Sequence, residues 1–89
     1  MNKKLLTIFN TYGKSHQTSK LLEEIGEFIE TIMNDDKENM VKELADVMVL
    51  LNQFKLYYCI YDEEVKRVMI EKINRQMERI ENEEQRKLT

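Results

Sequence analysis

Residues 43–51 have the sequence ELADVMVLL, and this stretch decides the fold. Apolar side chains occur on nearly every side of a helix drawn through it, which is typical of a central helix that other helices cover. The stretch therefore predicts a helix from about Lys37 to Tyr58. Asp46 stands among these apolar residues, so we expect its carboxylate to be partly desolvated. Such a group needs a cation, a hydrogen-bond network or a shifted pKa.

Helical patterns also fill the chain on both sides of this stretch. Leu5, Ile8, Phe9 and Tyr12 recur at steps of three and four, which predicts a first helix that stops at Gly13. A second helix is expected up to about Met33 and a fourth from about Glu63 to Gln85. The expected caps are Ser15 or Thr18 for the second helix, Asp35 with Glu38 for the third and Asp62 for the fourth. Since there is no linker or repeat, we predict one all-α domain over residues 1–89, a four-helix-type bundle with short connections.

Size, charge and composition narrow the classes of function. A chain of 89 residues builds a thin core, which assembly as a homo-oligomer would relieve. The net charge of −3 gives no basic field for holding a nucleic-acid backbone. No apolar run is long enough for a membrane span, and the N-terminus has no leader-like pattern. Cys59 is the only cysteine, so we expect a reducing, cytoplasmic environment and no membrane or nucleic-acid partner.

Two pairs of acidic residues are the strongest chemical signal. Glu24 and Glu27 are three residues apart on the second predicted helix, and Glu43 and Asp46 repeat that spacing on the third. Antiparallel helices joined by a short turn bring such pairs together, and the four carboxylates then repel one another unless divalent ions neutralise them. An all-oxygen ligand set favours Mg²⁺, with Mn²⁺ as a possible substitute. The other interpretation is a solvated acidic face, which glutamate pairs at this spacing commonly form, although it does not explain Asp46.

The acidic residues also carry a family resemblance. EEIGE at residues 23–27, followed after 15 residues by ELAD at 43–46, resembles the EExxE and ExxD motifs of MazG-type all-α nucleoside triphosphate pyrophosphohydrolases. The resemblance covers residues 17–51 well and extends more weakly to a downstream K-x-N segment, Lys72-Ile73-Asn74. It implies a Mg²⁺-dependent enzyme that cleaves a nucleoside or deoxynucleoside triphosphate between the α- and β-phosphates. The products are the monophosphate and pyrophosphate.

The resemblance also implies roles for individual residues. The implied metal ligands are Glu24, Glu27, Glu43 and Asp46, and Glu23 is a supporting or water-orienting acid counted with them among the catalytic residues. Lys72 and Asn74 are expected to contact phosphate or sugar oxygens. Apart from the resemblance, the position of Lys20 one turn before the acids would let it reach a phosphate, although an exposed lysine is the more common outcome. Family members assemble as dimers or tetramers. We expect the isolated His16, after Gly13, to be merely solvated.

Other hypotheses remain beside this one. The chain has no tryptophan, so an aromatic platform for a nucleobase must come from a phenylalanine or tyrosine, and the preference for base and sugar stays open. The number of metal ions, dimer against tetramer and the physiological role also stay open. The alternative function is a non-catalytic helical oligomer that acts as a regulatory or adaptor module. A carboxylate-bridged di-iron bundle needs Glu-x-x-His pairs, and His16 belongs to none.

Overall fold

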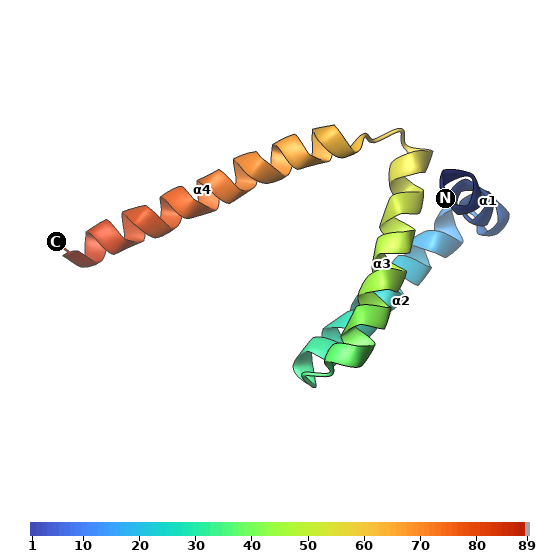
Figure 1. Cartoon of the computed structure of the whole chain (residues 1–89), viewed down its shortest axis with the longest axis horizontal. Helices are drawn as coiled ribbons and strands as arrows, with labels where there is room; N and C mark the ends of the chain where they lie inside the picture. The colour runs from blue at the N-terminus through green and yellow to red at the C-terminus, as the bar shows by residue number, and fades with distance from the viewer. Residues whose placement is uncertain (89) are drawn as a thin grey trace. The chain divides into compact units, whose positions relative to one another are not determined.

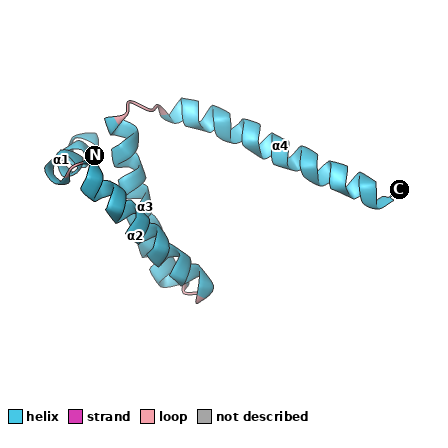
Figure 2. Cartoon of the chain, turned by 180° about the vertical axis from the view of Figure 1, so that it is seen from behind, coloured by secondary structure: helices cyan, strands magenta, loops and turns pink. Residues whose placement is uncertain are grey.

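The computed structural model describes residues 1–88, and every regular element in that range is a helix (Figure 1). The helices are α1 (Asn2–Tyr12), α2 (Lys14–Met33), α3 (Lys37–Tyr57) and α4 (Asp62–Leu88). The prediction of an all-α chain with four helices is therefore confirmed. Figure 2 shows how short the connections are. None of the helices within residues 1–88 is long and apolar enough to cross a membrane.

The chain divides into two units, which are described separately. The first, Met1–Cys59, contains α1, α2 and α3, which pack on one another. The second begins at Ile60 and contains α4, in which no side chain is buried. Val65, Met69, Ile73, Met77 and Ile80 recur along α4 at steps of three and four, so it is an amphipathic helix with an exposed apolar stripe. The bundle of four helices stays a prediction.

The core of the first unit centres on Phe9, whose side chain is only 1% exposed. Its ring meets Phe54 edge to face at 5.1 Å between centroids and lies 4.5 Å from the Tyr57 ring. Leu5 comes from the same face of α1, while Val47 and Leu50 are the buried apolar residues of α3. Aromatic rings bury large areas, and these contacts fix α1 against the C-terminal half of α3.

Two predicted helix starts were wrong, that of α2 by two or five residues, depending on the cap, and that of α4 by one. Gly13 has φ +90°, a conformation that costs glycine little, and α2 begins directly after it at Lys14. Ser15 and Thr18 therefore lie inside α2, where the Thr18 hydroxyl donates to the carbonyl of Lys14 at 2.8 Å. The fourth helix starts at Asp62 itself.

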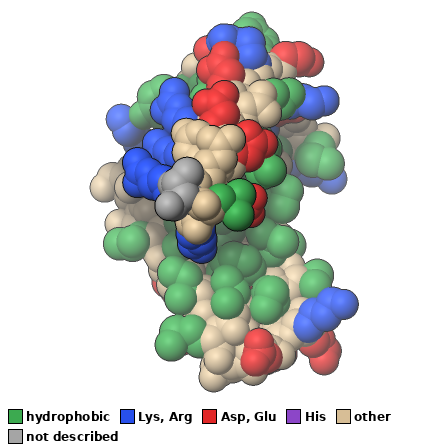
Figure 3. All heavy atoms as spheres, turned by 90° about the vertical axis from the view of Figure 1, so that its left-hand side faces the viewer, with side chains coloured by type: hydrophobic (Ala, Val, Ile, Leu, Met, Phe, Trp, Pro, Cys, Tyr) green, Lys and Arg blue, Asp and Glu red, His purple; other side chains and the backbone are tan. Residues whose placement is uncertain are grey.

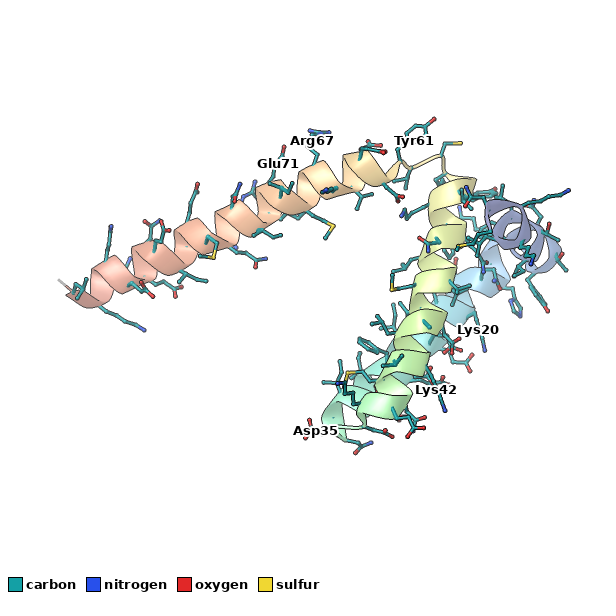
Figure 4. The ribbon with its side chains drawn as sticks, in the orientation of Figure 1. Lys20, Asp35, Lys42, Tyr61, Arg67 and Glu71 are labelled. Carbon is teal, nitrogen blue, oxygen red and sulfur yellow. The ribbon has the colours of Figure 1, made fainter. Side chains whose placement is uncertain are left out.

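The cap of α3 also differs from its prediction, and the turn between α2 and α3 explains why. Asp35 has φ +50°, a left-handed conformation that aspartate tolerates, and it closes the end of α2 (Figure 4). Its neighbour Asp36 caps α3 instead, where Oδ1 accepts from the backbone N–H of Asn39 at 3.3 Å and Oδ2 from the Asn39 amide at 2.6 Å. These hydrogen bonds lower the pKa of Asp36. The capping box predicted from Asp35 and Glu38 is replaced by this pair.

α3 is apolar around most of its circumference, as its sequence predicts, but this unit does not cover it all. Val47, Leu50 and Gln53, at steps of three, are buried against α1 and α2. Leu44, Met48 and Leu51 are exposed, and so are Leu22, Ile29 and Met33 of α2. Figure 3 shows hydrophobic side chains gathered in its lower part. Both helices therefore expose apolar side chains that this unit does not cover.

Candidate active site

Glu24 is the centre of the acidic cluster. It comes from the middle of α2 and is 6% exposed, the most buried of the acidic residues described. On α2, Gln17 and Thr31 lie seven residues before and after it and are also buried, so the three share the face that packs on α3. A carboxylate in this position is costly unless charges or hydrogen bonds compensate for its desolvation.

The acids form two overlapping groups with Glu24 in both. Ligand atoms of Glu24, Glu43 and Asp46 lie within 4.8 Å of one another, and the same holds for Glu23, Glu24 and Glu27. The structure therefore brings α2 and α3 acids together as the two i, i+3 pairs predicted. Glu27 and Glu43 face each other closely enough to interact electrostatically. Spacings of this size suit oxygen ligands gathered around one or two hard cations.

Lys20 lies beside this cluster on α2 (Figure 4). Its ammonium nitrogen is 3.2 Å from Oε1 of Glu24 and 3.8 Å from Oε2 of Glu23. The hydrogen bond with Glu24 and the charge of Glu23 raise the pKa of Lys20. One lysine balances only part of the negative charge of five carboxylates.

Two buried carboxylate oxygens in the cluster accept no hydrogen bond. With both carboxylates ionised, Oε2 of Glu24 and Oε2 of Glu43 are buried without a hydrogen-bond partner among residues 1–88. Buried polar atoms without partners are rare in native proteins and call for an explanation. Two such oxygens on facing helices, within an all-carboxylate group, fit the donor set of a hard divalent cation.

The Glu24 and Glu43 carboxyls titrate as a pair. A hydrogen bond with Glu24, together with burial and the nearby Glu27, raises the pKa of Glu43 to about 7. Burial also acts to raise the pKa of Glu24, but hydrogen bonds with Glu43 and Lys20 outweigh it and lower that pKa. The metal-free pair therefore holds one proton on Glu43 below neutral pH.

This proton has a consequence for stability. Since the pKa of Glu43 rises from 4.5 to about 7 on folding, its contribution to stability is complete below 4.5 and is lost as pH rises through about 7. We expect the melting temperature of metal-free wild type to fall more steeply between about pH 5 and about pH 8 than that of Glu43→Gln. Thermal unfolding followed by circular dichroism in chelator gives both profiles. Parallel profiles would contradict the shared proton.

Asp46 differs from its prediction. It is exposed, not desolvated, although it belongs to the group with Glu24 and Glu43. The reason is its position on α3: Val47 and Leu50 point into the core, and Asp46 lies at the edge of that face. The partly buried acids are Glu24 and, to a smaller extent, Glu43 and Glu27.

A hollow of about 640 Å³ opens next to the acids. Glu23, Glu24 and Asp46 form its acidic side, and Lys20 lines the hollow beside them. The rest of its lining comes from α1, α2 and α3, namely Ile8, Tyr12, His16, Gln17, Val49, Leu50 and Gln53. Its size is within the usual range for small-molecule sites. Glu27 and Glu43 line a neighbouring hollow, so the cluster stands between the two.

A direct comparison with known families identifies the family. A model of the MazG nucleotide pyrophosphohydrolase domain matches residues 13–81. The chain belongs to the MazG family. The match includes both acidic motifs and extends through the downstream segment of α4, which confirms the resemblance found in the sequence. No curated protein and no solved structure matched the chain.

The remaining predicted residues of this MazG domain lie on α4. Lys72 and Asn74 are exposed there, two residues apart, which places them on different sides of the helix. Lys72 shares a shallow hollow with Arg75, Gln76 and Arg79. Because α4 is described as a separate unit, contact of Lys72 and Asn74 with a substrate held at the acids stays a prediction.

Proposed function

We propose that this MazG-family protein is a Mg²⁺-dependent nucleoside triphosphate pyrophosphohydrolase. Its substrate is a nucleoside or deoxynucleoside triphosphate, which it cleaves between the α- and β-phosphates to the monophosphate and pyrophosphate. The observation that carries the proposal is the pair of buried, unpartnered oxygens on Glu24 and Glu43 within the all-carboxylate cluster. Above neutral pH, where the shared proton of Glu43 is lost, a non-catalytic helical module leaves these two oxygens unexplained.

In this proposal Glu24, Glu27, Glu43 and Asp46 hold the metal, with Mn²⁺ as a possible substitute. Bound Mg²⁺ would neutralise the phosphate oxygens and lower the pKa of a water molecule. Glu23 is 57% exposed in its side chain and stands next to the ligands, where its carboxylate can accept a hydrogen bond from that water and orient it. Loss of the Glu43 proton, which the free pair holds below neutral pH, makes the ligand set fully anionic.

Cations of the chain would hold the triphosphate. Lys20 pairs with Glu23 and Glu24 at the edge of the hollow, and its flexible stem allows the ammonium to turn to a phosphate oxygen. We place Lys72 and Asn74 as contacts to phosphate or sugar oxygens and treat residues 1–89 as one functional domain. The net charge of −3 provides no basic field for a nucleic acid, whereas a small phosphorylated ligand carried with a metal does not need one.

The exposed apolar surfaces support a homo-oligomer. Leu44, Met48 and Leu51 of α3 and the apolar stripe of α4 are each exposed within their own unit. A second copy of the chain, in a dimer or tetramer, would remove this area from water. The thin core of an 89-residue chain makes such burial valuable for stability.

The identity of the products tests the proposed reaction. We expect the folded protein with Mg²⁺ to convert a triphosphate to the monophosphate and pyrophosphate in equal amounts, because cleavage between the α- and β-phosphates yields no other pair. Phosphorus NMR of the reaction mixture distinguishes these products from a diphosphate and orthophosphate. Formation of the diphosphate and orthophosphate would place the cleavage at the wrong bond and reject the proposed reaction.

A further inference from the structure

The part of the hollow away from the acids is built differently from the rest of the surface. Two of its lining residues, Gln17 on α2 and Gln53 on α3, are 4% and 1% exposed. Burial of an amide is costly unless its hydrogen bonds are made. Two buried amides that face each other in a small core therefore hold one defined arrangement. They line the same hollow as Glu23, Glu24 and Asp46.

Hydrogen bonds fix the orientation of both amides. Nδ1 of His16 lies 2.8 Å from Oε1 of Gln17, and Nε2 of Gln17 donates to Oε1 of Gln53 at 2.8 Å. In this order His16 donates, Gln17 relays and Gln53 accepts. The amide nitrogen Nε2 of Gln53 is then at the end of the chain, and within residues 1–88 it has no acceptor. The hollow therefore contains a positioned N–H donor.

Aromatic rings stand at another part of the hollow. Tyr12 and His16 stack at 5.0 Å between centroids with an interplanar angle of 20°. Both residues are exposed, and both line the hollow. A flat heterocycle stacks well on such faces, and aliphatic side chains of Ile8 and Val49 add apolar area around it.

We propose that this hollow takes the nucleobase of the substrate and that the Nε2 amide of Gln53 donates a hydrogen bond to a carbonyl oxygen of the base. With that carbonyl at C4 of a pyrimidine or C6 of a purine, the site favours uracil, thymine or guanine nucleotides over cytosine and adenine nucleotides, which have an amino group at the same position. The inference rests on the proposed function, because the acids position the phosphates at the opposite side of the same hollow.

The hydrogen-bonded series His16–Gln17–Gln53, called the polar relay below, is what makes Gln53 present its N–H and not its oxygen to the base. A free glutamine presents either its oxygen or its nitrogen by rotating its amide, and it accepts both classes of base. While Gln17 keeps the orientation in which His16 donates to its Oε1, Gln53 cannot rotate without breaking its hydrogen bond to Gln17 and leaving that buried amide unpaired. An amino-bearing base would therefore put N–H against N–H in this pocket.

Uracil and cytosine nucleotides give the sharpest comparison, since they differ at the position of one exocyclic oxygen or amino group and at the neighbouring ring nitrogen. The probes are the non-hydrolysable α,β-imido analogues of dUTP and dCTP, titrated into the Mg²⁺-loaded wild-type protein by calorimetry. We expect the uracil analogue to bind at least about tenfold more tightly, as one matched hydrogen bond to a base typically gives.

Substitutions at Gln53 test the cause. Gln53→Met keeps the size of the side chain but removes the donor, and the uracil preference should fall to about twofold or less. Gln53→Glu presents only acceptors when ionised, so the preference should reverse towards cytosine. Gln85→Met, the same exchange at an exposed position of α4, should retain the wild-type preference. Melting curves identify a variant that fails to fold, and Gln53→Glu then serves in place of Gln53→Met.

The outcomes separate this inference from the proposed function. Wild type that binds both analogues equally, or cytosine more tightly, overturns the inference even if triphosphates are hydrolysed. So does a uracil preference that survives in both Gln53 variants. A uracil preference that depends on Gln53, in a protein that hydrolyses neither dUTP nor dCTP, supports the base pocket while the proposed function fails.

Discussion

Glu24→Gln is expected to lower Mg²⁺-dependent pyrophosphate release at least about a hundredfold, because partners in the outer shell of a metal ligand alone contribute about 10- to 100-fold. Glu24 is the residue shared by both acidic groups, and one of its oxygens is buried without a partner. The amide keeps the shape of the side chain but offers one neutral oxygen. Initial rates at saturating Mg²⁺ and triphosphate, measured beside wild type, give the effect.

A matched substitution shows whether the loss is specific. Glu38→Gln makes the same chemical change at an exposed position near the start of α3, outside both acidic groups, and should leave the rate near that of wild type. The Glu24 variant should fold, because removing one negative charge relieves the repulsion around Glu43. A folded Glu24→Gln protein that keeps more than about a tenth of the wild-type rate would contradict the central place of this residue.

Most of the fold was predictable because local sequence and packing agree. The periodic apolar residues of α1, the break at Gly13 and the apolar stretch of α3 each specify helix or its end without reference to the rest of the chain. The boundaries were less predictable, since two adjacent aspartates compete at one turn. Asp35 took the left-handed conformation and Asp36 the cap, a choice that depends on how α2 closes.

The acidic site was predictable in its members but not in its burial. A spacing of three residues placed each pair of acids on one face of its helix. The short turn between α2 and α3 then brought these two faces together. The sequence drew attention to Asp46 because its neighbours are apolar, yet Glu24 is the buried acid. The signal for Glu24 was present in another form: Gln17, Glu24 and Thr31 repeat every seven residues on the face that α3 covers.

The polar relay was missed for a related reason. Gln53 lies seven residues after Asp46 on α3, and Gln17 lies seven residues before Glu24 on α2. Because the two helices are antiparallel, both glutamines lie two turns from the acids in the same direction and on the same helix faces, where they meet. Glutamine is usually exposed, and one sequence does not distinguish a buried amide from a solvated one. His16, expected to be a solvated loop residue, lies on α2 and orients Gln17, although its ring is exposed.

Metal removal tests the central claim most directly. Pyrophosphate release is measured from a panel of nucleoside and deoxynucleoside triphosphates with Mg²⁺ and with chelator, for wild type beside Asp46→Asn. We predict release by wild type with Mg²⁺ from at least one triphosphate, a fall to background in chelator that added Mg²⁺ reverses, and a severe loss in Asp46→Asn. Release that continues at the same rate in chelator, or none from any substrate by a folded, Mg²⁺-loaded protein, would contradict the account.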